Sequence, residues 1–264
     1  MQCMTEPLRL LQFSDTHLMS DPAGELKGVR SLDAVRAVLQ HARLRHWNAD
    51  ALLLTGDLVH DDPDGYAQVR AVFGGLDKPV HCLPGNHDDV AAMRAALTAA
   101  PFHLGGLADF AHWRVVLLDS VAQGQAHGVL APAELARLEQ SLASAGGRHV
   151  LVCLHHHPVQ MASRWLDTVK LLNSQEFFAV VDRHSCVRAI SWGHVHQQFD
   201  VRRKGVRLLA VPSTCAQFTP YSEQFAVDTQ SHPGYRRFAL HADGSLETDI
   251  VRVDLHAAAL RAAG

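Results

Sequence analysis

Five short segments place metal-ligating side chains directly after apolar runs of the chain. The segments are Ser14-Asp15-Thr16-His17, Gly56-Asp57, Gly85-Asn86-His87-Asp88, His155-His156-His157-Pro158 and Gly193-His194-Val195-His196. In an extended chain, residues two apart point the same way, so Asp15 with His17 and His194 with His196 can each present two donors to one side. Imidazole, carboxylate and amide donors without a thiolate favour iron, manganese, zinc or cobalt over a soft metal.

The number of candidate donors indicates two ions and not one. The donors are Asp15, His17, Asp57, Asn86, His155, His194 and His196. Seven donors exceed what a single tetrahedral or octahedral ion usually takes from a protein. Glycines stand directly before several of them, at Gly56, Gly85 and Gly193, where the chain can turn sharply and approach closely because no Cβ obstructs it.

The elements that must position these donors form an α/β pattern. Short apolar runs alternate with helical periodicity, which predicts a largely parallel sheet with helical crossovers. The expected strands are residues 8–13, 51–54, 80–83, 113–118, 150–154 and 187–192, and the expected helices are 31–45, 66–73, 90–99, a segment between Pro132 and Gly146, and a segment that ends at Arg183. Ligands bind beyond the carboxyl ends of the strands in such sheets, so we expect the five segments to converge there.

Local signals predict how some elements begin and turn. Ser31 is a candidate cap for the helix 31–45, and Asn173 with Glu176 resembles a capping pair. After residue 192 the rhythm changes, because the runs 199–201, 207–211, 235–240 and 246–253 read as strands without helices between them. The C-terminal third is therefore predicted to be β-rich, with a two-residue hairpin turn at Asp243-Gly244.

Composition bounds the class of protein. The 264 residues carry 24 basic and 27 acidic side chains, a formal net charge of −3, and 47% are hydrophobic. A packed core is therefore expected, and no apolar run approaches the ~20 residues of a membrane-spanning helix. A near-neutral balance predicts neither a nucleic-acid nor a membrane partner. No linker divides the chain, so one domain over 1–264 is expected, with the motifs in 15–196, a β-rich part in 197–255 and a frayed tail in 256–264.

Two further features bear on the compartment. The N-terminus lacks the pattern of a secretory signal, which predicts a cytoplasmic location. The five cysteines are Cys3, Cys82, Cys153, Cys186 and Cys215. They are odd in number and form no C-x-x-C pair, so buried or inert thiols are expected and not disulfides or a zinc knuckle.

The five donor segments, in this order, resemble the calcineurin-like binuclear metallophosphoesterases. Their flanks are similar to the bacterial class III 3′,5′-cyclic AMP phosphodiesterases. The flanking segments are Leu154-His155-His156-His157-Pro158, Ser163-Arg164-Trp165-Leu166-Asp167, Gly193-His194-Val195-His196-Gln197, Pro212-Ser213-Thr214-Cys215 with Gln217-Phe218, and His241-Ala242-Asp243-Gly244. The resemblance implies a four-layer αββα sandwich, which differs from a single doubly wound sheet.

The resemblance also implies roles for the donors. It assigns Asp15, His17 and His196 to one metal and Asn86, His155 and His194 to the other, with Asp57 bridging. In the histidine triplet, His155 is chosen because it comes first after the strand; His156 is the next candidate and His157 the last. Asp61 and Asp62, which follow the second segment, receive a turn or supporting role and no ligand role.

The implied chemistry is hydrolysis of cyclic AMP to 5′-AMP. Two divalent ions, iron or manganese first and zinc or cobalt next, would activate a bridging hydroxide for in-line attack on phosphorus. His87 would stabilise the phosphoryl group or protonate the departing 3′-oxygen, so His87 and Asp57 are the catalytic candidates. Contacts to the substrate are expected from His17, Asn86, His87 and His196.

Alternatives remain open at this stage. The same metal centre could serve a broader phosphodiesterase or phosphatase, for example on 2′,3′-cyclic nucleotides, or a non-enzymatic metal-dependent scaffold. Trp165 and Phe218 could stack on a nucleobase or could be core or dimer contacts. An oligomer is compatible with the sequence but not indicated by it. The remaining histidines are expected to be structural or solvated; they are His41, His46, His60, His81, His103, His112, His127, His149, His184, His232, His241 and His256.

Overall fold

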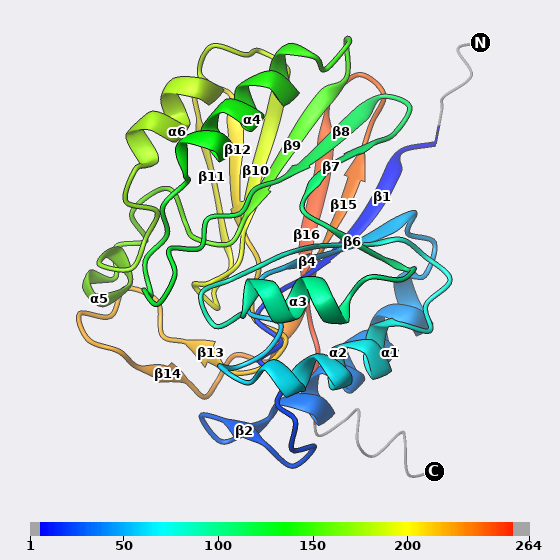
Figure 1. Ribbon diagram of the computed structural model, residues 1–264, viewed down its shortest axis with the longest axis vertical. Helices are drawn as coiled ribbons and strands as arrows, with labels where there is room; N and C mark the ends of the chain where they lie inside the picture. The colour runs from blue at the N-terminus through cyan, green and yellow to red at the C-terminus, as the bar shows by residue number, and fades with distance from the viewer. Residues whose placement is uncertain (1–5, 256–264) are drawn as a thin grey trace.

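Two six-stranded sheets lie face to face in the computed structural model, which describes residues 6–255 (Figure 1). The first sheet has the order β16 (Leu246–Arg252), β15 (Gly234–Leu240), β1 (Leu8–Phe13), β4 (Ala51–Thr55), β5 (Val80–Leu83) and β6 (Phe102–Leu104). The second has the order β11 (Phe199–Arg203), β12 (Val206–Ala210), β10 (Val187–Trp192), β9 (His149–Leu154), β8 (Trp113–Leu117) and β7 (Gly106–Asp109). The frayed tail expected for 256–264 lies outside the described residues.

Helices cover the outer face of each sheet. The first sheet packs against α1 (Ser31–His46), α2 (Tyr66–Phe73) and α3 (Val90–Ala96), and the second against α4 (Pro132–Ala143) and α6 (Ser174–Val181). Smaller elements are the one-turn helix α5 (Arg164–Asp167), the 3₁₀ turn Pro63–Gly65, and two short ribbons, β2 (Glu25–Leu26) with β3 (Val29–Arg30) and β13 (Gln217–Phe218) with β14 (Val227–Asp228). The α/β class and the four-layer sandwich are confirmed.

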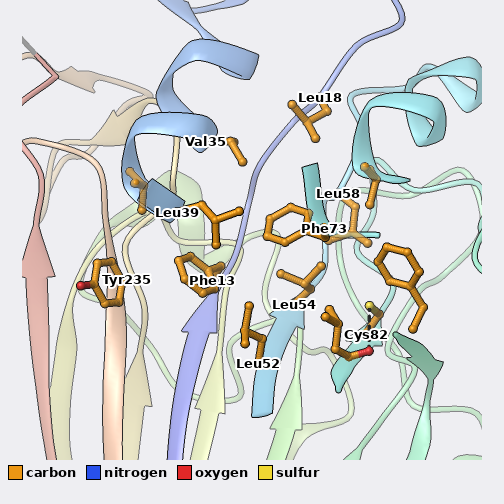
Figure 2. Close-up of a cluster of buried hydrophobic side chains, with 14 of the residues drawn as sticks. Phe13, Leu18, Val35, Leu39, Leu52, Leu54, Leu58, Phe73, Cys82 and Tyr235 are labelled. Atoms are coloured by element: carbon orange, nitrogen blue, oxygen red, sulfur yellow. Dashed lines mark hydrogen bonds between the residues drawn. The ribbon is translucent and has the colours of Figure 1, made fainter. Parts of the chain in front are cut away.

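Alternation along the central strands builds the layers. In β4, Leu53 points into the interface between the sheets, whereas Leu52 and Leu54 point toward the helices. Figure 2 shows the helix-side cluster, in which Phe13 packs near Leu54 and Phe73. Because both faces of these strands are buried, their sequences are continuously apolar and do not alternate with polar residues.

The central strands of each sheet are parallel. β1, β4 and β5 run parallel in the first sheet, and β8, β9, β10 and β12 in the second. Helices connect them, as in β1–α1–β4 and β4–α2–β5. The donor segments follow the carboxyl ends of β1, β4 and β5 on one side of the sandwich and of β9 and β10 on the other.

Three local predictions are wrong, and in two of them contacts distant in sequence take the polar atoms. Helix α1 has Arg30 and not Ser31 at its N-cap, and Ser31 Oγ lies 3.4 Å from Cys215 Sγ. Asn173 is the N-cap residue of α6 but makes no side-chain cap bond; its amide instead exchanges hydrogen bonds of 2.9 and 3.0 Å with the backbone of Leu130. The β15–β16 turn is longer than two residues, since Leu240 pairs with Leu246 and Gly244 has a φ of 85° while Asp243 has no positive φ.

Other differences are small. Helix α3 ends at Ala96 and not near residue 99, and the short strands β2, β3, β6, β7, β13 and β14 are not anticipated by the sequence pattern. Of the cysteines within the described residues, Cys82, Cys153 and Cys215 are buried free thiols and Cys186 is a partly buried one, in agreement with the prediction of no disulfides. No helix in residues 6–255 combines the length and the apolar character needed to cross a bilayer.

Candidate metal centre

Four donor atoms converge at the ends of β4, β5, β9 and β10. His155 Nε2 lies 3.2 Å from Asp57 Oδ2, 3.2 Å from Asn86 Oδ1 and 3.3 Å from His194 Nδ1. His155, His194 and Asp57 are buried, and Asn86 is partly buried. We refer to His155, Asn86, His194 and Asp57 as the first donor set.

A second set converges beside it at the ends of β1 and β10. His17 Nε2 lies 3.1 Å from His196 Nε2, and His196 Nε2 lies 3.4 Å from Asp15 Oδ1. His17 Nε2 is also 3.8 Å from Asp57 Oδ2. The second donor set is therefore Asp15, His17, His196 and Asp57, and the Oδ2 atom of Asp57 is common to both sets.

These distances fit a pair of divalent ions. Ligand atoms about 2.1 Å from one ion, separated by tetrahedral or octahedral angles, stand about 3.0–3.4 Å from each other. Most of the contacts in both sets fall in that range. Direct contact between two imidazole nitrogens, or between two acceptor oxygens, adds little stability by itself, so an ion between the donors accounts better for their spacing. Asp57 Oδ1 accepts a 2.9 Å hydrogen bond from the backbone N–H of His87, which leaves Oδ2 directed between the two sets. The structure thus brings together all seven donors that the sequence predicts.

Hydrogen bonds on the far side of the rings fix how the histidines point. His155 donates from Nδ1 to the carbonyl oxygen of Thr55 at 2.8 Å, and His196 donates from Nδ1 to that of Ala216 at 2.7 Å. Each bond leaves Nε2 facing its donor set, as is usual for metal-ligating histidines. His17 is held differently, because its Nδ1 lies 3.1 Å from Nδ1 of His60.

His60 is a residue that sequence reasoning missed. It was expected to be structural or solvated, yet it lies against both His17 and His87, with ring centroids 5.0 and 4.6 Å away. Imidazole nitrogens of His17, His60 and His87 lie within 4.8 Å of one another. The one indication in the sequence was its position three residues after Asp57. That spacing does not predict a contact with His17 unless the course of the turn after β4 is known.

Five of the seven donors sit on strained backbone. Asp15, His17, Asp57, His194 and His196 have positive φ angles of 55°, 45°, 50°, 65° and 49°. Residues with a Cβ pay roughly 1–2 kcal/mol for this left-handed conformation, and such strain tends to gather at functional sites. A Cβ on Gly85 would collide with the backbone nitrogen of Asp57, and one on Gly56 would collide with His155 Nδ1, so both glycines permit the close approach that the sequence indicates.

Mutual charge stabilises the buried carboxylates. Burial would raise the pKa of Asp57, but His155 and His17 hold that pKa well below its usual range. Burial likewise opposes a charge on His155, yet Asp57 and Asp15 raise the pKa of His155 to about 9. His194 behaves oppositely, because burial and the neighbouring His155 lower its pKa to about 3. The centre therefore combines two carboxylates with neutral and cationic imidazoles. A divalent ion that binds there would displace the proton of a cationic imidazole, because a ligating histidine must be neutral.

Supporting acids surround the centre. His87 Nδ1 lies 3.0 Å from Asp61 Oδ2, which matches the supporting role expected for Asp61. Asp62 accepts a 2.7 Å bond from the Ser20 N–H and one from Asp64, which is a turn role. Asp88, to which the sequence assigned nothing, accepts bonds from the backbone of Leu58 and Gly85 and from the Tyr66 hydroxyl. Burial and the nearby Asp57 raise the pKa of Asp88 to about 6.

The histidine triplet divides into three environments. His155 reaches both Asp57 and Asn86, as described above. His156 has its Nδ1 2.8 Å from Ser120 Oγ, and an imidazole nitrogen of His156 lies within 4.8 Å of donor atoms of His155 and His194. His157 is fully buried, and neither of its nitrogens has a hydrogen-bond partner within the described residues. This geometry favours the order His155, His156, His157 that the sequence predicts.

A cavity of about 250 Å³ opens onto the centre. One side is formed by donor residues and His87, and the other side is apolar, with Trp165 and Phe218 among its residues. Its complete lining is His17, Leu26, Lys27, Asp57, His60, Asn86, His87, Ala126, Trp165, Leu166, Val169, His194, His196, Phe218 and Phe225. The four residues expected to contact a substrate, His17, Asn86, His87 and His196, all line this cavity.

Comparison with known proteins agrees with the geometry. The profile of the calcineurin-like phosphoesterase family matches residues 8–198. The 3′,5′-cyclic adenosine monophosphate phosphodiesterase CpdA of Vibrio vulnificus is 39% identical over 248 residues, which cover 93% of this chain and 90% of that protein. CpdA of Escherichia coli K12 is 38% identical over 248 residues, with the same coverage.

Solved structures support the fold. A dimetal phosphatase from Danio rerio superimposes with a TM-score of 0.64 at 16% identity and covers 95% of this chain and 100% of that one. GAP50 of Plasmodium superimposes with a TM-score of 0.62 at 10% identity, covering 98% and 95%. At these identities the likeness concerns the architecture alone. From the match of its family profile and its identity to these relatives, the chain belongs to the calcineurin-like phosphoesterase family.

Proposed function

We propose that this chain is a metal-dependent phosphodiesterase that hydrolyses 3′,5′-cyclic AMP to 5′-AMP. The observation that carries the proposal is the shared oxygen of Asp57, which lies 3.2 Å from His155 Nε2 and 3.8 Å from His17 Nε2, between two donor sets. The relatives described above, which match over 93% of the chain, are named as cyclic AMP phosphodiesterases. The name of these relatives supports cyclic AMP as the substrate, and the donor geometry supports metal-dependent hydrolysis.

We assign Asp15, His17 and His196 to one ion, Asn86, His155 and His194 to the other, and Asp57 to both. When bound, divalent ions at these positions supply Lewis acidity and lower the pKa of a coordinated water from 15.7 toward roughly 7. Asp15 and Asp57 are the only acidic donors, and Asn86 ligates without charge. The donor residues therefore leave the centre positive, which suits an anionic phosphodiester.

His87 is the proposed proton donor to the departing 3′-oxygen. Its ring lines the cavity, and its Nδ1 is held by Asp61 at 3.0 Å, which leaves Nε2 available to the substrate. Asp61 fixes the ring orientation, as a carboxylate does in other histidine–acid pairs. General acid help of this kind contributes typically ~10² to 10⁴ in rate.

A hydrolysis panel combined with metal analysis tests the proposal. The panel contains 3′,5′-cyclic AMP, 3′,5′-cyclic GMP, 2′,3′-cyclic AMP, an aryl phosphodiester and an aryl phosphomonoester, each assayed with iron, manganese, zinc and cobalt. We expect two ions per chain and the highest kcat/KM for 3′,5′-cyclic AMP, with 5′-AMP as product. A higher kcat/KM on another ester would show that cyclic AMP is not the preferred substrate. A metal-loaded protein inactive on the whole panel would support the scaffold alternative.

Two related expectations stay predictions. Nitrogen and oxygen donors favour iron or manganese, with zinc and cobalt next, and the panel above ranks them. A cytoplasmic location fits a cyclic-nucleotide hydrolase, and fractionation of the native cells with an antibody to the chain would test it.

A further inference from the structure

The apolar side of the cavity is a cluster of three aromatic rings. Trp165 comes from α5, Phe218 from β13 and Phe225 from the segment between β13 and β14. Their ring centroids are 5.1 to 5.3 Å apart, and each pair meets at an angle between 70° and 76°. We call these three residues the aromatic cluster.

The aromatic cluster is tied directly to the second donor set. The Phe218 ring stacks on the ring of His196, with centroids 3.9 Å apart and an interplanar angle of 7°. One face of Phe218 is thus occupied by a proposed metal ligand, and Trp165 and Phe225 meet the ring at steep angles. Phe218 therefore serves as a fixed link between the centre and the two outer rings.

Phe225 is the open member of the cluster. Its side chain is 45% exposed although it lines the cavity. None of the other exposed large apolar residues within the described range, such as Leu44 and Val201, lines the cavity. A partly exposed aromatic ring beside a polar centre is a feature of ligand-binding sites and not of a core.

Lys27 adds a positive charge at the same place. It stands at the turn between β2 and β3, where Lys27 and Gly28 have φ angles of 52° and 82°. Its Nζ lies 5.1 Å from the centroid of Phe225, and Lys27 also lines the cavity. A cation over an aromatic ring holds that ring in place and draws anionic ligands toward the cavity mouth.

We propose that the aromatic cluster is the nucleobase subsite and that Phe225, steadied by Lys27, is its specificity-determining residue. The inference rests on the proposed function, because a phosphodiester held at the donor sets places its base one sugar ring away. Leu166 and Val169, which line the cavity together with the cluster, are apolar and suit a planar base better than a charged group. Base–aromatic stacking is worth about a 5- to 150-fold change in affinity on truncation to alanine.

The test compares two product-like ligands that differ only in the base. Isothermal titration of the metal-loaded protein with 5′-AMP and with ribose 5-phosphate is done for the wild type, Phe225→Ala and Phe225→Tyr. We expect Phe225→Ala to weaken 5′-AMP about tenfold and to leave ribose 5-phosphate unchanged, with Phe225→Tyr restoring the affinity. In the assay, Phe225→Ala should raise KM for cyclic AMP with little change in kcat, since stacking acts on the ground state and the transition state alike.

Tyr221→Ala is the matched control. Tyr221 lies in the same segment, is 79% exposed and does not line the cavity. Its loss should therefore change the affinity for neither 5′-AMP nor ribose 5-phosphate. Equal affinity of wild type and Phe225→Ala for 5′-AMP would overturn the subsite even if cyclic AMP is hydrolysed. Equal weakening of ribose 5-phosphate, or a change of oligomeric state with base binding intact, would overturn it as well. Base-dependent binding without hydrolysis of any cyclic nucleotide would instead contradict the proposed function and leave the subsite in place.

Discussion

Asp57 has a position that no other donor shares, because one of its oxygens serves both donor sets. Replacing it by Asn keeps the shape and the hydrogen bond from His87 but removes a buried negative charge between two cations. We expect Asp57→Asn to lower kcat by at least about 10³ and to lower the metal content below two ions per chain. Elemental analysis and steady-state kinetics measure both quantities. Asp64→Asn, on the exposed turn nearby, is the control and should behave as the wild type.

The histidine triplet offers an internal comparison at the residue scale. His155 Nε2 contacts Asp57 and Asn86, whereas His156 Nδ1 is engaged by Ser120 Oγ. We expect His155→Ala to lose one ion and most activity, and His156→Ala to retain more of both. Metal stoichiometry of the two variants decides the matter. Equal losses, or a larger loss for His156→Ala, would contradict the assignment of His155.

His60 is a positioning residue in this arrangement, because it contacts Nδ1 of His17 and not the Nε2 atom that faces the second donor set. If Nδ1–H of His17 donates to His60 Nδ1, then His60 orients the Nε2 lone pair of His17. We expect His60→Leu to weaken metal affinity about 10- to 100-fold and His60→Gln, which keeps an acceptor, to restore much of it. Competition with a chromophoric chelator measures the affinity independently of catalysis. Full affinity in His60→Leu would show that His17 needs no such partner.

The seven donors could be predicted from the sequence, because their residue types suit metal binding and each follows a predicted strand at the edge of the sheet where ligands bind. His60 and Asp88 were not visible for the opposite reason. Their roles come from partners brought close by the fold, namely His17 for one and Leu58, Tyr66 and Gly85 for the other. Nothing in the local sequence distinguishes them from histidines and aspartates in ordinary turns.

At the scale of elements, the same arrangement recurs: a buried strand is followed by a left-handed turn that carries the donors. Buried apolar strands were predictable, since length and hydrophobicity identify them. Caps were not, because Ser31 and Asn173 bond to Cys215 and Leu130, which lie 184 and 43 residues away. The edge strand β7 was also missed, since Gly106 and Leu107 are exposed and carry no apolar run.

Gly85 tests how closely the strand ends must approach. A Cβ at this position would collide with the backbone nitrogen of Asp57 and approach the ring of His155, so β4, β5 and β9 would have to separate. We expect Gly85→Ala to destabilise the protein by about 1–3 kcal/mol and to lower metal content. Urea denaturation and elemental analysis measure these effects. Gly75→Ala is the control, because a Cβ there meets nothing within 4 Å and should be neutral or slightly stabilising.

At the scale of the molecule, the two donor sets join the two sheets. Asp15, Asp57 and Asn86 follow strands of the first sheet, whereas His155, His194 and His196 follow strands of the second. Even without ions, polar contacts cross this boundary, since the backbone N–H of His194 donates to Asp15 at 3.0 Å. Each donor set draws from both sheets, so ions bound there would act as crosslinks between them.

Removal of the ions should therefore lower the stability of the whole sandwich. Ligands that bind only the folded state stabilise it by RT ln(1 + [L]/Kd), about 2.7 kcal/mol at a hundredfold excess over Kd. For a chain of this size each kcal/mol shifts Tm by about 2–4 °C, so chelation is expected to lower Tm by about 5–10 °C. Calorimetry before and after treatment with a chelator, followed by return of manganese, measures the shift and its reversal. Asp57→Asn should show a smaller shift, because it holds fewer ions. A wild-type Tm that does not respond to chelation would mean that the donor sets do not connect the sheets through metal.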